Sequence, residues 1–338
     1  MQNQTISDKI SCGRLAMTLG VVIIHCNVMM VPDYDGSDIL TGFFDFVLCM
    51  TDVCVPWFFF ISGYLLVHRH PDTDWTCYKS LVYRRVRSIL IPYLLWNTIA
   101  FLIRAGINLS PLGQFTNGRQ NFDSITGFVM DVYVQPELMP LWFLRNLFIF
   151  VLVSPVIRYL VRFNAIVALI LLWVSDHYFY LGGILYYGMG FIFAKNYSPD
   201  RFDKWLAISI KMLPFVLLLT FAINLFSYDL PVIGYVLIFF QMLGIWGLAC
   251  RFITSTGIID RPDNMFFIYA AHGIVTPYLL RTLSMIFDFS GYYWLVCYVA
   301  SVIIVIGTTF GAALVFKSIS PNIYALLTGY RYKKSSPL

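Results

Sequence analysis

The chain has 338 residues, of which 59% are hydrophobic and only 12% are charged, about half the charged share of soluble domains. This composition excludes a large soluble domain and predicts an all-α, polytopic membrane protein with a single membrane-embedded domain over residues 1–338. The net charge of +5 does not indicate a nucleic-acid partner, because membrane topology accounts for the basic residues. The 7 cysteines form no C-x-x-C pair, and we expect no metal site.

About ten apolar stretches follow one another along the chain, each a candidate membrane span of roughly 20 residues. The fifth and sixth are short, so tilted or re-entrant segments are an alternative for this pair. The predicted spans cover residues 12–31, 44–67, 85–108, 141–163, 165–178, 180–195, 206–226, 231–250, 265–287 and 292–316.

Basic residues between these stretches predict the orientation. If the N-terminus is cytoplasmic, only four of the 23 Lys and Arg lie on the opposite side, namely Arg104, Arg119, Arg145 and Arg281. An excess of Lys and Arg in cytoplasmic connections is the usual pattern in membrane proteins. We therefore expect both termini in the cytoplasm. The longest connection, 109–140, is then extracytoplasmic, either an acceptor-binding segment or an irregular connection.

The first span carries a cation and a titratable base. On a helix, Arg14 and His25 share one face and are separated by about three turns, roughly 16 Å along the axis. Polar groups of this kind are costly inside a bilayer and usually face a protein interior or cavity. Arg14 is expected at the cytoplasmic boundary and His25 deeper in the membrane.

Two further polar residues are expected near the depth of His25. These are Asp52 in the second span and His272 in the ninth. A carboxylate that accepts a hydrogen bond from one ring nitrogen of a histidine makes the other nitrogen a better base. Pairing between helices for packing specificity is the alternative interpretation. The nearby Ser62 lacks a nucleophile elbow, and Ser62-Gly63 instead predicts a close helix contact.

Residues 78–87 form the densest basic cluster and include Arg85 and Arg87. Arginine side chains bind phosphate oxygens well, so this cluster could bind a cytoplasmic nucleotide-like ligand. The alternative interpretation is that the cluster only reflects the excess of basic residues on the cytoplasmic side. Arg145 follows Trp142 near the outer face, where it either extends toward the surface or holds an acceptor or an intramolecular acid.

Several motifs together resemble the acyltransferase-3 superfamily of integral membrane acyltransferases, which includes many bacterial cell-surface O-acetyltransferases. They are Arg14 with His25; residues 56–65, PWFFFISGYL; Arg85 and Arg87 followed by Ile91-Pro92-Tyr93; Leu141-Trp142-Phe143-Leu144; and residues 268–272, IYAAH. Their order along nearly the whole chain carries the resemblance.

The resemblance implies a multi-pass protein of the bacterial cytoplasmic (inner) membrane. Its members move an acyl group, usually acetyl, from cytoplasmic acyl-CoA (acetyl-CoA) to a hydroxyl of a glycan or lipid-linked sugar. We expect the donor phosphates on Arg85, Arg87 and Arg14.

For catalysis, we expect His25 as general base or as acylated nucleophile. Asp52 would orient its ring, and His272 would stabilise the oxyanion or position the acceptor. Trp142 and Arg145 belong to the acceptor side.

A transporter or exporter of a glycan is the alternative function, because intramembrane histidine and aspartate also serve proton relays. Internal repeats, which are frequent in transporters, are not evident between the two halves of the chain. A membrane scaffold or sensor would leave the alignment of Arg14 and His25 unexplained. The acceptor, the choice of acetyl or succinyl, and the oligomeric state stay open.

Overall fold

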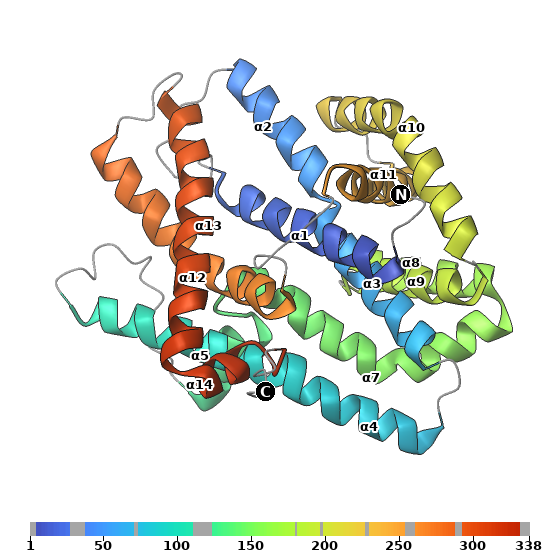
Figure 1. The fold of residues 1–338 in the computed structure, drawn as a ribbon, viewed down its shortest axis with the longest axis horizontal. Helices are drawn as coiled ribbons and strands as arrows, with labels where there is room; N and C mark the ends of the chain where they lie inside the picture. The colour runs from blue at the N-terminus through green and yellow to red at the C-terminus, as the bar shows by residue number, and fades with distance from the viewer. Residues whose placement is uncertain are drawn as a thin grey trace, which may run out of the picture. The chain divides into compact units, whose positions relative to one another are not determined.

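The computed structural model describes residues 5–27, 38–70, 74–110, 124–179, 181–196, 199–226, 230–253, 261–287 and 293–331. These residues form helices and no strand, as the all-α prediction requires. Figure 1 shows the helices in chain order: α1 (Ile6–His25), α2 (Asp38–Thr51), α3 (Cys54–Arg69), α4 (Trp75–Arg85), α5 (Ile91–Asn108), α6 (Ile125–Val129), α7 (Trp142–Phe163), α8 (Ala165–Tyr178), α9 (Ile184–Asn196), α10 (Pro199–Leu225), α11 (Pro231–Phe252), α12 (Pro262–Ile286), α13 (Tyr293–Ile319) and α14 (Pro321–Leu327).

The chain divides into two compact units. The first comprises Met1–Ile24, Gly36–Lys79 and Ile149–Arg261, and the second comprises His25–Asp35, Ser80–Phe148 and Pro262–Leu338. The single domain over residues 1–338 stays a prediction.

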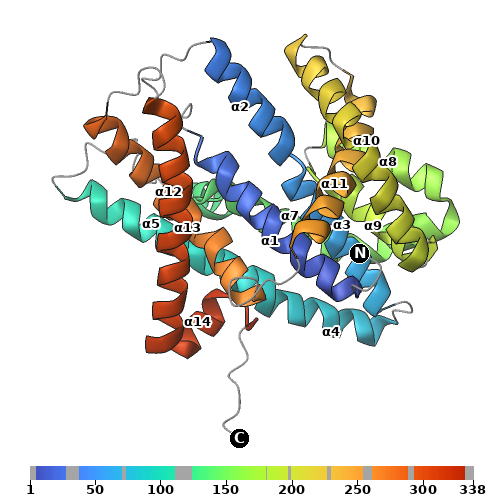
Figure 2. The ribbon, with the colours of Figure 1, turned by 45° about the horizontal axis from the view of Figure 1, so that its top comes forward.

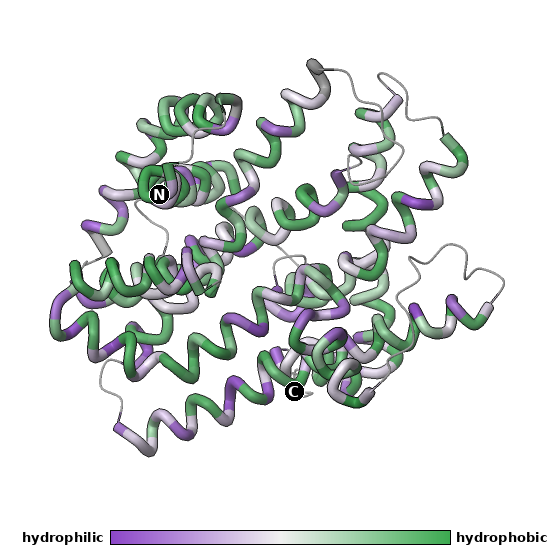
Figure 3. Tube along the Cα trace, turned by 180° about the vertical axis from the view of Figure 1, so that it is seen from behind, coloured by the Kyte–Doolittle hydropathy of each residue, from purple (hydrophilic) through white to green (hydrophobic). Residues whose placement is uncertain are grey.

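Within the described residues, six helices are long and apolar enough to cross a membrane. They cover Thr41–Arg69, Trp75–Asn108, Met139–Phe163, Arg201–Asn224, Pro231–Phe252 and Tyr293–Ile319. Figure 3 shows hydrophobic residues along most of the helical surfaces. The protein is therefore a multi-pass membrane protein. The six helices match the second, third, fourth, seventh, eighth and tenth predicted spans, while the count of ten and the cytoplasmic termini stay predictions.

The first three predicted spans differ from the structure in their bounds. Helix α1 ends at His25, six positions before the predicted end at residue 31, so this histidine lies at a helix terminus. The predicted span 44–67 consists of α2 and α3, which are separated by a turn at Asp52 and Val53. The third span begins ten residues before the predicted start at 85, because α4 continues through the π-helix η2 (Val86–Leu90) into α5.

Helix α1 begins with a capping box. The Asp8 backbone N–H donates to Thr5 Oγ1 at 3.2 Å, and the Thr5 backbone N–H donates to the Asp8 carboxylate at 3.0 Å. The Thr5 hydroxyl and backbone N–H stabilise this carboxylate and lower the pKa of Asp8 below its usual range. One turn after Thr5, buried Lys9 pairs with Asp203 on α10. The Lys9 carbonyl oxygen also accepts a hydrogen bond from Trp246 Nε1 at 2.6 Å. These contacts fix the start of α1 in the first unit.

The first unit is built around a close contact between α3 and α9. A Cβ added at Gly63 would lie 2.1 Å from the Tyr187 carbonyl oxygen, and one added at Gly190 would lie 2.2 Å from the Phe60 carbonyl oxygen. Only glycine allows the two backbones to approach this closely. The close helix contact predicted from Ser62-Gly63 is confirmed.

In the second unit, α12 and α14 pack beside α5, α13 packs against α12 and α14, and both views show α14 next to the lower end of α13 (Figure 2). Polar contacts join these helices. The Tyr324 hydroxyl donates to Asn264 Oδ1 at 2.8 Å, and Lys317 pairs with Asp263 at 2.7 Å. Trp96 Nε1 on α5 donates to the Leu327 carbonyl at the end of α14, at 3.0 Å.

Candidate active site

Two of the predicted site residues, His25 and His272, meet in the second unit. Their ring centroids are 5.0 Å apart with an angle of 61° between the planes. His25 is the last residue of α1 and is half-buried, whereas His272 lies within α12 and is fully buried. Two titratable rings in edge contact, one of them half-accessible, are an arrangement suited to proton transfer.

One hydrogen bond determines the tautomer of His272. Its Nδ1 pairs with the carbonyl oxygen of Tyr269, one turn earlier on α12. Because a carbonyl oxygen only accepts, we assign the proton of the neutral ring to Nδ1. Nε2 then carries a lone pair. This atom is buried and has no hydrogen-bond partner among the residues that the structure describes.

Tyr269 connects this histidine to the start of α7. Its hydroxyl donates to the carbonyl oxygen of Pro140, which lies in the 3-10 turn η5 (Met139–Leu141). Its ring also contacts the edge of Phe143, with centroids 6.1 Å apart. The aromatic motif around residues 141–144 is therefore held against the helix that carries His272.

Arg145 is fixed one turn into α7. Its guanidinium donates to the Val134 carbonyl oxygen and, through Nε, to Asn146 Oδ1 at 3.1 Å. Asn146 is buried and Arg145 is half-buried, as is Trp142 in the preceding turn. The Arg145 side chain thus bonds, within the second unit, to the segment before α7. Its two predicted roles, extension toward the surface and contact with an acceptor or an intramolecular acid, stay predictions.

The segment before α7 is supported by side chains of α5. Glu137 pairs with Arg104 on α5 at 2.6 Å, and both side chains are largely buried. The Leu138 backbone N–H donates to Asn97 Oδ1 at 3.0 Å. The predicted connection 109–140 therefore contains ordered structure, namely α6 and the π-helix η4 (Met130–Val134). Residues 111–123 of that connection lie outside the described residues.

Arg85 and Arg87 lie where α4 passes into α5. Arg85 is the last residue of α4, and exposed Arg87 lies in the π-helix η2. Such π-turns inside α-helices are frequent at functional sites. The Arg87 guanidinium lies over the Tyr330 ring at 4.5 Å and near the Tyr83 ring at 6.0 Å. The aromatic rings hold the cation while leaving its side chain accessible.

The residues after α14 complete this basic region. Gly329 and Tyr330 both have positive φ, 66° and 59°, and a Cβ at Gly329 would lie 2.4 Å from the Ser88 carbonyl oxygen. The turn places Arg331 so that its Nη1 donates to that same oxygen at 2.9 Å. Its guanidinium also stacks over Phe266 of α12 at 4.0 Å. From the sequence, Arg331 had counted only toward topology, and Tyr330 had not been considered.

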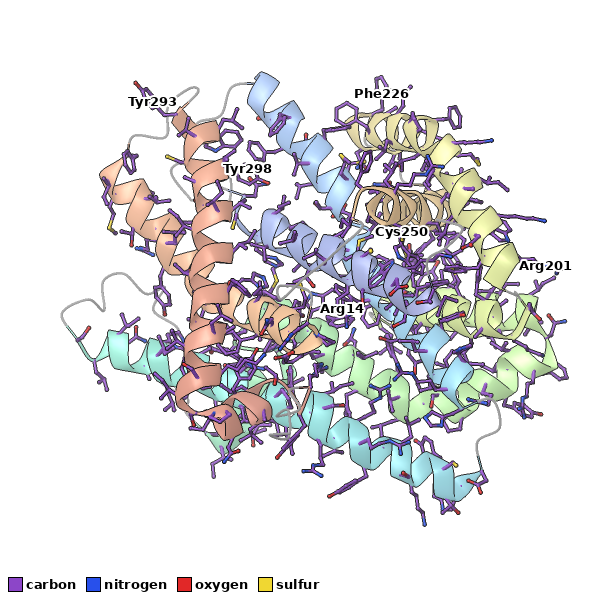
Figure 4. All side chains as sticks on the ribbon, viewed as in Figure 1. Arg14, Arg201, Phe226, Cys250, Tyr293 and Tyr298 are labelled. Carbon is purple, nitrogen blue, oxygen red and sulfur yellow. The ribbon has the colours of Figure 1, made fainter. Side chains whose placement is uncertain are left out.

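Arg14 and Asp52 belong to the first unit. Arg14 donates from Nη2 to Ser11 Oγ at 2.7 Å, and Figure 4 labels it on α1. The preceding Gly13 lets α1 approach two indoles, since a Cβ there would lie 2.3 Å from Trp57 and 2.6 Å from Trp246. Asp52 is exposed in the turn between α2 and α3. Its predicted role as orienting acid for His25 stays a prediction.

The described residues contain no group of three or more His, Cys, Asp or Glu that could hold a metal ion. The described cysteines are Cys12, Cys26, Cys49, Cys54, Cys77, Cys250 and Cys297, all free thiols and all buried except Cys77.

The sequence model of the acyltransferase-3 family, described as an acyltransferase domain, matches residues 8–315. The chain belongs to this family. The match includes Arg14, His25, Arg85, Arg87 and His272. A curated relative, the succinoglycan biosynthesis protein ExoH of Rhizobium meliloti (strain 1021), is 29% identical over 178 residues, or 49% of this chain and 46% of the relative. The chain thus matches about half the length of that relative. No solved structure matches the chain.

Membership of the acyltransferase-3 family confirms the family predicted from the motifs, and with it the enzyme class of acyltransferase. The motif residues of this acyltransferase-3 chain are distributed over both units. His25, Arg85, Arg87, Trp142, Arg145 and His272 lie in the second unit, and Arg14 and Asp52 lie in the first. The second unit by itself therefore holds the histidine pair, one basic motif and the aromatic motif.

Proposed function

We propose that the protein transfers an acyl group, most simply acetyl, from cytoplasmic acyl-CoA to a hydroxyl of a cell-surface glycan or lipid-linked sugar in the bacterial cytoplasmic membrane. The contact between His25 and His272 is the observation that carries the proposal. The family description supports acyl transfer, and the relative named for succinoglycan biosynthesis supports a polysaccharide acceptor.

His25 acts as general base in this proposal. It takes the proton of the acceptor hydroxyl while the hydroxyl oxygen attacks the thioester carbonyl carbon. The tetrahedral intermediate then collapses, the C–S bond breaks, and the CoA thiolate receives the proton from His25. The products are the acyl ester and free CoA, with the base regenerated.

His272 supports that base through its Nε2 atom. With the proton on Nδ1, Nε2 can accept a hydrogen bond from protonated His25 or from the acceptor hydroxyl. This tautomer favours a positioning role for His272 over donation to an oxyanion. In this way His272 supplies the orienting function that the sequence had assigned to Asp52.

The donor phosphates contact Arg85 and Arg87 in this scheme. Arg87 is exposed and is held by two tyrosine rings, which limits the conformational freedom lost when it binds a phosphate. Arg14 is proposed as a further donor-binding residue. Trp142 and Arg145 are proposed for the acceptor side, because Tyr269 joins their helix to the histidine pair.

The test is transfer of labelled acetyl from acetyl-CoA to glycan in membranes that contain the protein. His25→Ala is expected to lower the rate by about 100-fold or more, the usual contribution of a general base. His177→Ala is the matched control, since His177 is an exposed histidine at the end of α8.

Normal transfer by folded His25→Ala would contradict the proposed role of the base. Export of glycan without any covalent label in the wild-type protein would instead indicate the transporter function. Labelled succinyl-CoA in place of acetyl-CoA distinguishes the two acyl donors.

A further inference from the structure

The first unit contains a pocket whose lining residues are different from those assigned to the proposed reaction. Its volume is about 340 Å³, within the range of small-ligand sites. The pocket lies where α3, α7 and α9 end, and its lining includes four basic residues, His68, Arg158, Arg162 and Lys195. Its lining residues include no carboxylate among those the structure describes.

Two of these basic side chains are held in place by their neighbours. Arg158 donates from Nη2 to the His70 carbonyl oxygen at 2.7 Å, which directs its guanidinium toward the end of α3. The His68 ring stacks on Tyr64 with centroids 5.5 Å apart and 12° between the planes. A ligand that binds here therefore meets preorganised groups.

The inner wall of the pocket is apolar. Phe191 and Val161 line it and are 2% and 6% exposed. A low-dielectric wall strengthens the field of nearby cations compared with the same charges in open water. The pocket thus combines an apolar wall with a rim of basic residues, Arg162, Lys195 and His68, which are exposed.

Basic residues at helix C-termini and on the cytoplasmic side are common in membrane proteins. Those two effects account for one or two cations at each helix end. The pocket adds a second feature, since basic side chains from three helices converge on one hollow that also has an apolar wall.

We propose that this pocket binds a phosphate-bearing anion at the cytoplasmic face of the membrane. Arginine presents a planar fork that bonds two phosphate oxygens at once, and the pocket offers two arginines together with Lys195. The phosphate has two possible sources. One is the headgroup of an anionic phospholipid, which basic pockets between membrane helices bind on this side. The other is a soluble nucleotide-like molecule such as CoA.

The experiment uses the full-length protein in phosphatidylcholine nanodiscs. One arm adds phosphatidylglycerol and counts retained lipid by native mass spectrometry. The other arm titrates free CoA and follows binding by calorimetry. The double variant Arg158→Gln/Arg162→Gln is compared with Arg201→Gln/Lys204→Gln, two exposed basic residues on α10, of which Figure 4 labels Arg201.

The pocket variant is expected to bind one of the two probes about tenfold or more weakly, while the α10 control binds as wild type. Loss confined to phosphatidylglycerol identifies a lipid site, and loss confined to CoA identifies a nucleotide site. Equal affinity of the pocket variant, the control and the wild type for both probes overturns the proposal.

A second variant covers the case in which the double variant does not fold, because Arg158 also bonds to the chain after α3. Lys195→Gln changes one exposed side chain and is expected to weaken the same probe by about threefold. If the double variant does not fold, the single variants Lys195→Gln and Arg162→Lys decide. Unchanged binding of both probes by these two variants would then count against the site. The readout is binding alone, so it is independent of acyl transfer.

Discussion

In the first unit, α3 and α9 meet backbone to backbone at Gly63 and Gly190, whereas the second unit is joined by side chains that donate to backbone carbonyls. Its donors include Trp96, Tyr269 and Arg331, which reach the ends of helices and the turns between them. Inside a membrane, non-helical backbone is tolerated only where its polar groups are satisfied within the protein. The contact between α3 and α9 in the first unit is thus set by shape, while the second unit uses polar contacts to fix the irregular segments around the histidine pair.

The largest effect is expected from breaking the packing in the first unit. In Gly63→Val the new side chain would overlap the Tyr187 carbonyl, and no flexible group can move aside. We expect a loss of about 4 kcal/mol or more in the free energy of unfolding. Thermal unfolding in detergent measures it. Gly42→Val is the control, because a Cβ at Gly42 meets nothing within 4 Å. Equal stability of the two variants would contradict the packing argument.

A smaller effect, on activity alone, is expected in the second unit from His272→Asn. The asparagine amide can still donate to the Tyr269 carbonyl, but the variant lacks the Nε2 lone pair. We expect acetyl transfer to fall about 100-fold with little change in unfolding temperature. His272→Gln, which restores a polar group near the Nε2 position, should recover part of the rate. If His272→Asn lowered the unfolding temperature in parallel with the transfer rate, the result would instead assign His272 to packing.

The smallest effect is expected from Tyr269→Phe, which keeps the ring and removes the hydroxyl that donates to Pro140. An unsatisfied buried carbonyl costs about 1–3 kcal/mol, so we expect the unfolding free energy to fall by that amount. Tyr293→Phe, at the exposed start of α13, serves as control. No difference between the two variants would mean that the second unit does not depend on this bond.

The sequence was sufficient for the membrane class, the all-α fold class and the family, because apolar content and the order of motifs can be read directly along the chain. The helix ends were harder to predict. The apolar run continues beyond His25, so hydropathy placed the end of the first span at residue 31, although α1 ends at His25. Likewise, nothing in the apolar pattern around Asp52 indicates a turn there, and Asp52 is exposed.

The candidate site was predicted in part. His25 and His272 were selected because each is a costly residue at membrane depth, and the structure brings them together. The Tyr269 contacts could not be predicted, since they depend on the tertiary placement of Pro140. The basic pocket was also missed, because Arg158, Arg162 and Lys195 had been counted only as signals of orientation.

The π-helix at Val86–Leu90 has a consequence for the rotational phase of the long helix from Trp75 to Asn108. A π-turn contains one residue more than an α-turn. The side chains of α4 are therefore rotated about the helix axis by roughly 100°, the angle of one residue, relative to their positions in an uninterrupted α-helix with α5. Removing a single residue within it would therefore rotate Arg85 and the rest of α4 about the axis relative to α5. The direction in which Arg85 points therefore depends on the number of residues in this π-turn as well as on the arginine itself.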